Sequence, residues 1–167
     1  MMKKVIQTLN KLVSEGIIGK YAIGGSIGAM FYTETFSTKD VDVFVLPQMM
    51  PSGVVHLGAI YDYLRKSGFK MEGQYFIIGG VPVDFVAVYN DLTLEALGNT
   101  VELSYEKIKV KVLRPEYLSA IALQTGRSQD LKKAGLLSAE AGLDKELLKD
   151  ILKRHGLSKK WREYIGR

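Results

Sequence analysis

Hydrophobic residues follow two different spacings along this chain. Over 3–15 they recur at the spacing of one helical face, whereas β-branched and aromatic residues run without a break over 41–46, as in a buried strand. The same criteria predict strands at 21–23, 41–46, 70–78, 81–88 and 108–112, and helices at 3–15, 27–32, 54–67, 115–125, 128–138, 144–154 and 158–165. This order predicts an α/β (α+β) fold with a small mixed sheet, helices packed mainly on one face, and a C-terminal helical segment.

Glycine and proline mark the joints between these elements. Gly79-Gly80 is expected to form a hairpin turn between two strands. Pro115 suits the first turn of a helix, where its missing N–H has no partner to lose. The sequence therefore predicts an α/β core over 1–114 and a helical segment over 115–167, packed together as one unit.

Composition narrows the class of protein. The chain has 167 residues, 47% of them hydrophobic, which is typical of a globular domain. It has no cysteine, which excludes disulfides and thiolate metal sites and favours a cytoplasmic location. No stretch approaches the roughly 20 apolar residues that span a bilayer. Lys11 and Glu15 interrupt the first apolar segment, so we expect neither a secretory signal nor a membrane partner.

The net charge of the chain bears on its binding partners. The 23 Lys and Arg exceed the 18 Asp and Glu, for a net charge of +5, which permits a polyanionic partner such as RNA, DNA or an acidic protein. Basic residues are dense over 145–167, where Trp161 and Tyr164 also lie. This tail is either an electrostatic footprint for RNA or the solvated face of amphipathic helices, because acidic residues are interspersed with the basic ones.

The tripeptide Gly24-Gly25-Ser26 follows a predicted strand and precedes a predicted helix. Glycines let a backbone approach a phosphate closely and adopt positive φ. The free N–H groups of the following helix favour an anion, and the Ser26 hydroxyl is expected both to cap that helix and to add a donor. The tripeptide therefore indicates a nucleotide-binding turn.

Three aspartates indicate a metal site. Asp40 and Asp42 alternate along a strand, so both carboxylates point to one face, about 7 Å apart at Cα. Asp84 lies among apolar residues of a later strand, an expensive place for a charge without a partner. Clustered carboxylates repel one another unless cations neutralise them, and oxygen ligands favour Mg²⁺ or Mn²⁺.

Together these motifs resemble the signature of the nucleotidyltransferase superfamily, which contains DNA polymerase beta and the kanamycin nucleotidyltransferases. Residues 21–46 match its Gly-Ser turn and Asp-x-Asp pair, and Asp84 matches its third aspartate. The resemblance implies that Asp40, Asp42 and Asp84 are catalytic and hold the metal, and that an NTP is the substrate. One metal would orient and deprotonate an acceptor hydroxyl, while the other would stabilise the leaving pyrophosphate.

A narrower resemblance is to small bacterial and archaeal members similar to the abortive-infection toxins of the AbiEii type. It rests on residues 113–118, which lead into a helix, and on residues 126–131, which follow it. It implies that Arg127 binds the nucleotide, that the acceptor is RNA such as a tRNA end, and that an antitoxin protein is a partner. The chain departs from this pattern at Ala122, where relatives often carry a lysine, and at Lys133, where they carry a second acid.

Other interpretations stay open. The chain is alternatively a non-catalytic nucleotide-binding or regulatory module, or a basic nucleic-acid or protein interaction domain with structural aspartates. Asp84 could form a salt bridge instead of binding metal, and Arg127 and Asp130 could be a helix-capping pair. Arg127 or Lys132 could replace the missing lysine. The two histidines lie apart from the acidic motif and are assigned no role.

Overall fold

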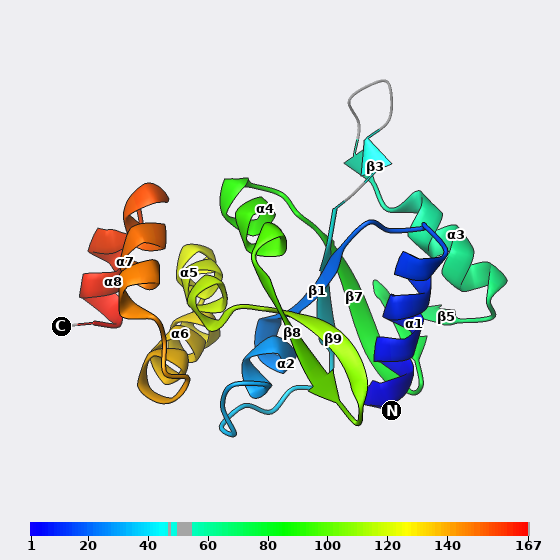
Figure 1. Ribbon diagram of the computed structural model, residues 1–167, viewed down its shortest axis with the longest axis horizontal. Coiled ribbons are helices and arrows are strands. Elements are labelled where there is room, and N and C mark those ends of the chain that lie inside the picture. Colours follow the sequence, from blue (N-terminus) through cyan, green and yellow to red (C-terminus); the bar gives the residue numbers. More distant parts are fainter. Residues whose placement is uncertain (47, 50–54, 167) are drawn as a thin grey trace.

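The chain forms a seven-stranded mixed sheet with helices on both faces (Figure 1). The computed structural model describes residues 1–46, 48, 49 and 55–166. The strands of the sheet, in spatial order, are β5 (Lys70–Glu72), β6 (Tyr75–Ile78), β7 (Val81–Ala87), β2 (Val41–Val45), β1 (Tyr21–Gly24), β9 (Ile108–Leu113) and β8 (Thr100–Tyr105). Two short strands, β3 (Gln48–Met49) and β4 (Val55–His56), form a separate pair. The α/β class with a mixed sheet is confirmed.

Eight helices accompany the strands in the described part of the chain. They are α1 (Met2–Ser14), α2 (Gly25–Met30), α3 (Gly58–Lys66), α4 (Asp91–Gly98), α5 (Pro115–Thr125), α6 (Ser128–Glu140), α7 (Lys145–Arg154) and α8 (Ser158–Tyr164). Pro115 occupies the first turn of α5 as predicted. None of the described helices is long and apolar enough to cross a membrane.

The middle of the sheet aligns three positions that the sequence singled out. β2 pairs antiparallel with β1 and parallel with β7. These registers put Gly24 beside Asp42 and Asp42 beside Asp84. Paired residues of neighbouring strands lie about 5 Å apart and point to the same face of a sheet. The two carboxylates therefore emerge side by side, next to the end of β1.

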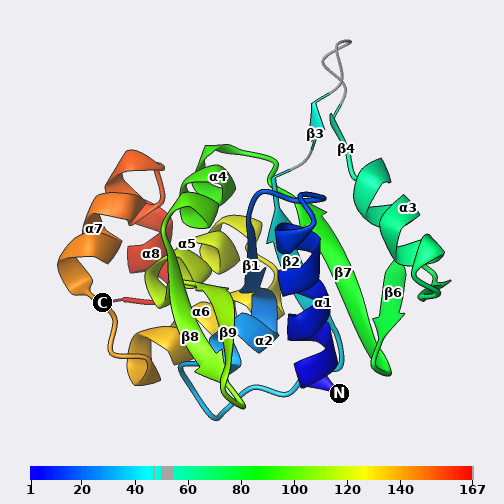
Figure 2. The same ribbon diagram turned by 45° about the vertical axis from the view of Figure 1, so that its right-hand side comes forward.

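Two apolar cores lie on opposite faces of the sheet. Val43 belongs to the core beneath α1 and α3, whereas its neighbour Phe44 belongs to the core beneath α4 and α5. Figure 2 shows α1 and α3 across the sheet from α4 and α5. The expectation that helices pack mainly on one face is therefore wrong. Strands such as β2 are apolar on both faces, and each face needs its own helical cover.

Turns explain where the observed elements agree with and differ from the predicted ones. The predicted strand at 70–78 is a hairpin, because Gly73 has a φ of 61° and turns the chain between β5 and β6. The predicted turn at Gly79-Gly80 is confirmed, and both glycines have positive φ. α4 and β8 lie outside the predicted elements. Asn90 starts α4 with a capping box completed by Thr93, not by the usual Glu or Gln.

Two helix starts also differ from prediction. α2 begins at Gly25, with Gly24 as its N-cap and no side-chain cap, so the expectation that Ser26 caps it is wrong. The helix predicted over 54–67 begins at Gly58 in the structure, because residues 55 and 56 form β4 instead. Its predicted first residue, Val54, lies outside the described residues.

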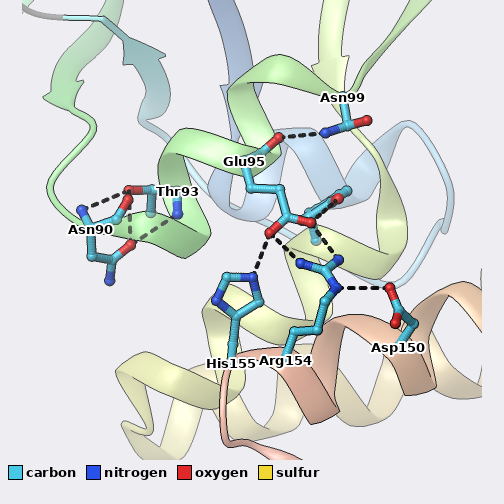
Figure 3. Close-up of polar contacts among 8 residues, drawn as sticks. Asn90, Thr93, Glu95, Asn99, Asp150, Arg154 and His155 are labelled. Atoms are coloured by element: carbon cyan, nitrogen blue, oxygen red, sulfur yellow. Dashed lines mark hydrogen bonds and ion pairs between the residues drawn. The ribbon is translucent and has the colours of Figure 1, made fainter.

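A carboxylate network ties α7 to α4 (Figure 3). Glu95 of α4 accepts hydrogen bonds from Arg154 at 2.8 and 2.5 Å and from the hydroxyl of Tyr117 at 2.9 Å. His155 lies 2.5 Å from the same carboxylate. These partners hold the pKa of Glu95 at about 2, first through the Arg154 hydrogen bonds. The hydrogen-bonded carboxylate of Glu95 thereby holds the C-terminal helices against α4. The division into 1–114 and 115–167 stays a prediction.

Candidate functional site

A cleft of about 370 Å³ opens where the sheet faces α5 and α6. Its apolar lining comes from both sides and includes Phe44, Val86 and Leu113 of the sheet and Leu118, Ile121 and Ala122 of α5. Its polar lining comprises Asp40, Asp42, Gln74, Tyr75, Asp84, Tyr89, Thr125, Arg127, Asp130 and Lys133. The three predicted aspartates and Arg127, distant in sequence, thus meet in one cavity.

The sheet wall of the cleft is acidic. Asp42 and Asp84 pair across β2 and β7, and Asp40 precedes β2 by one residue, on the same face as Asp42. Burial raises the pKa of Asp42 to about 6, and repulsion from Asp40 and Asp84 adds to this effect. Burial also raises the pKa of Asp84, with Asp40 contributing. The other carboxylates therefore lie close enough to Asp42 and Asp84 to disfavour the ionised forms of these two residues.

Neutral donors partly satisfy two of these carboxylates. The Thr38 hydroxyl donates to Asp40 at 2.9 Å, and the Gln74 amide donates to Asp84 at 2.8 Å. Asp42 has no side-chain hydrogen bond within the described part of the chain. No ion pair to Asp84 occurs there either, which argues against the salt-bridge interpretation.

The donor set can be tested against a divalent cation. Burial, and then repulsion from Asp40 and Asp84, raises the pKa of Asp42, and the three carboxylates provide the oxygen ligands that suit Mg²⁺ or Mn²⁺. However, no group of three or more His, Cys, Asp or Glu within the described residues is already arranged to hold an ion. Thr38 and Gln74 each engage one oxygen of Asp40 and Asp84, which leaves the other oxygen of each carboxylate for a ligand. The residues therefore fit a cation in chemistry, while their side chains are not gathered around one point.

The glycine–serine turn adjoins the acidic wall. Gly25 lines the cleft with a φ of 57°, and a Cβ there would overlap Oδ2 of Asp42. A Cβ at Gly24 would overlap the Phe44 ring. Glycine at these positions therefore lets the start of α2 lie directly against β2. Ser26 is the second residue of α2, and its side chain is not part of the cleft lining.

The opposite wall is basic. Asp130 of α6 is buried, with its side chain 7% exposed, and accepts from Nε of Arg127 at 2.7 Å. Nζ of Lys133 lies 3.7 Å from its other oxygen, with the lysine side chain 15% exposed. Lys133 and then Arg127 lower the pKa of Asp42 against the effect of burial. Arg127 is the N-cap residue of α6 and pairs with Asp130 in its first turn, without a side-chain hydrogen bond to the helix backbone, so the helix-capping interpretation of this pair stays open beside the nucleotide-binding one.

Several polar residues of the cleft lie outside the sequence-predicted site, among them Gln74, Tyr75, Tyr89 and Lys133. Gln74 and Tyr75 enter it because Gly73 reverses the chain, and Tyr89 follows β7 at the rim, 59% exposed. Asp40, followed by burial, raises the pKa of Tyr75. Lys133 lies three positions after Asp130, so the two residues share one face of a helix. The docking of α6 is what brings that face to the cleft. Lys132, which was suggested beside Arg127 as a replacement for the missing lysine, is exposed and does not line the cleft.

Comparisons with known proteins find the fold but no sequence family. No protein-family model matches the chain, and no curated protein matches it. An antigenic nucleotidyltransferase-like protein from Paracoccidioides brasiliensis superposes with a TM-score of 0.58 at 16% identity, covering 99% of this chain and 94% of that one. ANT(2″)-Ia in complex with adenylyl-2″-tobramycin superposes with a TM-score of 0.57 at 15% identity, covering 94% and 97%. A solution structure of ANT(2″)-Ia gives 0.55 at 14% identity, covering 95% and 92%. The chain therefore has the fold of nucleotidyltransferase-like proteins.

Proposed function

We propose that the chain is a magnesium-dependent nucleotidyltransferase that moves a nucleoside monophosphate from a nucleoside triphosphate to a hydroxyl acceptor. The observation that carries this proposal is one cleft of about 370 Å³ in which three carboxylates face two cationic side chains. Opposed walls of this kind suit a ligand that brings phosphates and a divalent cation together. The shared fold supports the same reaction class by analogy.

The basic wall would bind the triphosphate. Asp130 holds Arg127 and Lys133 through its two oxygens, so both cations are oriented before a ligand arrives. Lys133 lines the same cleft as Ala122, the position where AbiEii-type relatives often carry their lysine. The charge missing from α5 is thus supplied from α6. Gly25 would let phosphate oxygens approach the backbone beside Asp42.

The acidic wall would hold the metal. Asp40, Asp42 and Asp84 are the proposed ligands, and Mg²⁺ or Mn²⁺ is the proposed ion. When bound, the ion would neutralise these carboxylates, polarise the acceptor hydroxyl and stabilise the leaving pyrophosphate. Asp84 is our candidate for assisting deprotonation of the acceptor, since burial raises its pKa and thereby the affinity of its carboxylate for a proton.

Two kinds of hydroxyl acceptor are proposed for the cleft. The AbiEii-type resemblance favours an RNA end such as that of tRNA, with a toxin role, an antitoxin partner and a cytoplasmic location. The structural neighbour ANT(2″)-Ia was solved with adenylyl-2″-tobramycin, so an aminoglycoside-like hydroxyl is the second acceptor to test. Both acceptors present a hydroxyl to the same acidic wall.

Label transfer tests the proposal directly. The protein is incubated with each labelled NTP, Mg²⁺ or Mn²⁺, and either total tRNA or an aminoglycoside. We expect metal-dependent labelling of one acceptor, which Asp40→Ala abolishes while Asp62→Ala, at an exposed acid on α3, does not. No transfer from any NTP to either acceptor would contradict the proposal.

A nucleotide-binding or regulatory module is the second candidate. It is favoured because no group of three or more metal-ligating side chains within the described residues is already arranged to hold an ion. This candidate predicts that NTP and Mg²⁺ raise the thermal unfolding temperature without any transfer. The labelling assay and this measurement together separate the two candidates.

A further inference from the structure

A second cavity, of about 510 Å³, lies between α6, α7 and α8. We call it the helical groove. Its lining comprises Ser138, Ala139, Gly142, Leu143, Lys145, Leu148, Lys149, Leu152, Lys153, Ser158, Trp161 and Arg162. Four of these side chains are cationic, one is a tryptophan, and none is acidic. Lys145, Lys149 and Lys153 are spaced four apart, so they form one stripe along α7.

Within the described residues, the cations of the helical groove have no carboxylate partners. None of the four lies within 4.0 Å of an acidic side chain in the described part of the chain, although acids are present on the same helices. Asp144 accepts from the backbone N–H of Leu147 as the N-cap of α7. Asp150 pairs with Arg154 at 2.9 Å, and Glu163 pairs with Lys159 at 3.9 Å.

This allocation of charges favours an RNA-binding surface over a merely solvated helix face as the interpretation of the basic tail. A merely solvated amphipathic face would intersperse its acids with its bases. Here three of the four acids between residues 144 and 163 are engaged by a cap or by cations that do not line the groove. A concentrated positive potential therefore remains over one concave surface.

Trp161 gives the groove a second property. It lines the cavity next to Leu148 and Leu152 and is only partly exposed, so its ring is held by packing. Gly166 lies against its indole nitrogen edge, where a Cβ would come within 2.5 Å of Nε1. A fixed aromatic ring beside a row of lysines can stack a base while the lysines neutralise the adjoining phosphates.

We propose that the helical groove binds single-stranded nucleic acid. The lysine stripe of α7 and Arg162 would follow the phosphate backbone, and Trp161 would stack a base. An acidic protein segment would use the cations but would leave the indole without a role. The proposal does not rest on the function proposed for the cleft, because the groove and the cleft share no lining residue.

One helix, α6, lines both the groove and the cleft. α6 contributes Lys133 to the cleft and Ser138 to the groove. Lys160 of α8 brings its Nζ against Gly126, the residue before Arg127, where a Cβ would come within 2.6 Å of it. Lys160 thus places a cation of α8 beside the residue that precedes Arg127 of the cleft.

Fluorescence anisotropy with the full chain and a labelled single-stranded RNA of about 12 nucleotides tests the proposal. We expect the double variant Lys149→Gln/Lys153→Gln to weaken binding roughly tenfold and to reduce the slope of log affinity against log salt by about 1.4, since each phosphate contact contributes about 0.7. Trp161→Leu should weaken binding about tenfold with an unchanged slope, and Trp161→Phe should largely restore it.

Matched controls keep the outcome interpretable. Lys20→Gln/Lys66→Gln removes the same charge from exposed positions outside the groove and should leave binding within about twofold. Asp42→Asn should remove transfer but leave RNA binding intact, which separates this proposal from the first. Single-stranded DNA should bind comparably, since no contact of the groove needs a 2′-hydroxyl. Absence of RNA binding, equal losses in both lysine pairs, or equally tight binding of an acidic peptide would overturn the proposal.

Discussion

Asp42 and Glu95 are two partly buried carboxylates with opposite environments. Burial and the neighbouring Asp40 and Asp84 raise the pKa of Asp42 to about 6. Hydrogen bonds, first from Arg154, lower the pKa of Glu95 to about 2. Glu95 joins α4, α5 and α7, whereas Asp42 faces an open cleft without a side-chain hydrogen bond in the described part of the chain.

This difference separates a structural charge from a functional candidate. A carboxylate surrounded by donors stabilises the fold and has no capacity left for a ligand. A carboxylate kept among like charges is costly to the fold and is neutralised only when something enters the cleft. Substitution of Glu95 should therefore affect stability, and substitution of Asp42 should affect activity.

The largest expected effect is on transfer. Asp42→Asn keeps the shape of the side chain but removes the charge that a cation needs. We expect the rate of nucleotidyl transfer to fall by on the order of 10³-fold, the size of the loss when a group that stabilises developing charge is removed. The measurement is initial rate at saturating NTP and Mg²⁺, with Asp62→Asn on α3 as the control. Transfer within tenfold of wild type would exclude Asp42 from the chemistry.

Glu95→Gln should show the opposite effect. Three donors lose a charged acceptor, so the free energy of unfolding should fall by about 2 to 3 kcal/mol, as for other charge-assisted hydrogen bonds. Urea denaturation measures this loss, and Glu146→Gln, at an exposed acid on α7, should change stability by less than about 0.5 kcal/mol. The transfer rate per folded molecule should be unchanged. A large loss of transfer in Glu95→Gln would remove the contrast with Asp42.

The same network has a defined pH dependence. Because the folded-state pKa of Glu95 is lowered from 4.5 to about 2, its stabilising contribution is complete above pH 4.5 and is lost as the pH falls toward 2. Wild type and Glu95→Gln should therefore converge in stability between these pH values. Urea midpoints at pH 6, 4 and 3 measure the convergence, and a constant difference at all three would contradict it.

The acidic wall was predictable from sequence, whereas of the two cations in the basic wall only Arg127 was. Asp40 and Asp42 lie two residues apart on a β-branched strand, so strand geometry alone puts them on one face. The pairing of Asp42 with Asp84 needs only the parallel register of β2 and β7. Lys133 enters the site through the docking of α6 against the sheet domain, and no local pattern determines such a tertiary contact.

The fold was predictable to a similar degree. Helices after Pro115 agree with prediction to within about two residues, since caps and apolar spacing mark their ends locally. The hairpin at Gly73 and the helix at Asn90 were missed, because a single glycine between Glu72 and Gln74 and a Thr-completed capping box are weak signals. The two-faced packing was missed because an apolar run does not show which neighbours will cover it.

A smaller effect should come from the basic wall. Lys133→Met keeps the aliphatic stem but removes a charge held beside Asp130, so the affinity for ATP in Mg²⁺ should fall about tenfold, as for one charge-assisted contact. Lys132→Met is the matched control, because Lys132 is the exposed neighbour of Lys133 and does not line the cleft. Isothermal titration calorimetry with ATP measures both. Equal affinities in the two variants would return the phosphate contact to Arg127 alone.

The smallest effect concerns the stability of the metal-free protein. Because the folded-state pKa of Asp42 is raised from 3.8 to about 6, the unfolded state releases this proton first, and stability should decrease as the pH rises through this range. Asp42→Asn should therefore be more stable than wild type by about 1 kcal/mol at pH 8 in EDTA, after discounting for solvent screening in an open cleft. The gain should vanish near pH 4 and should shrink when Mg²⁺ is added, because only wild type gains a neutralising ligand. Urea denaturation of both proteins at pH 8 and pH 4, with and without Mg²⁺, measures all three differences. A destabilised Asp42→Asn at pH 8 in EDTA would mean that Asp42, like Glu95, is a structural charge.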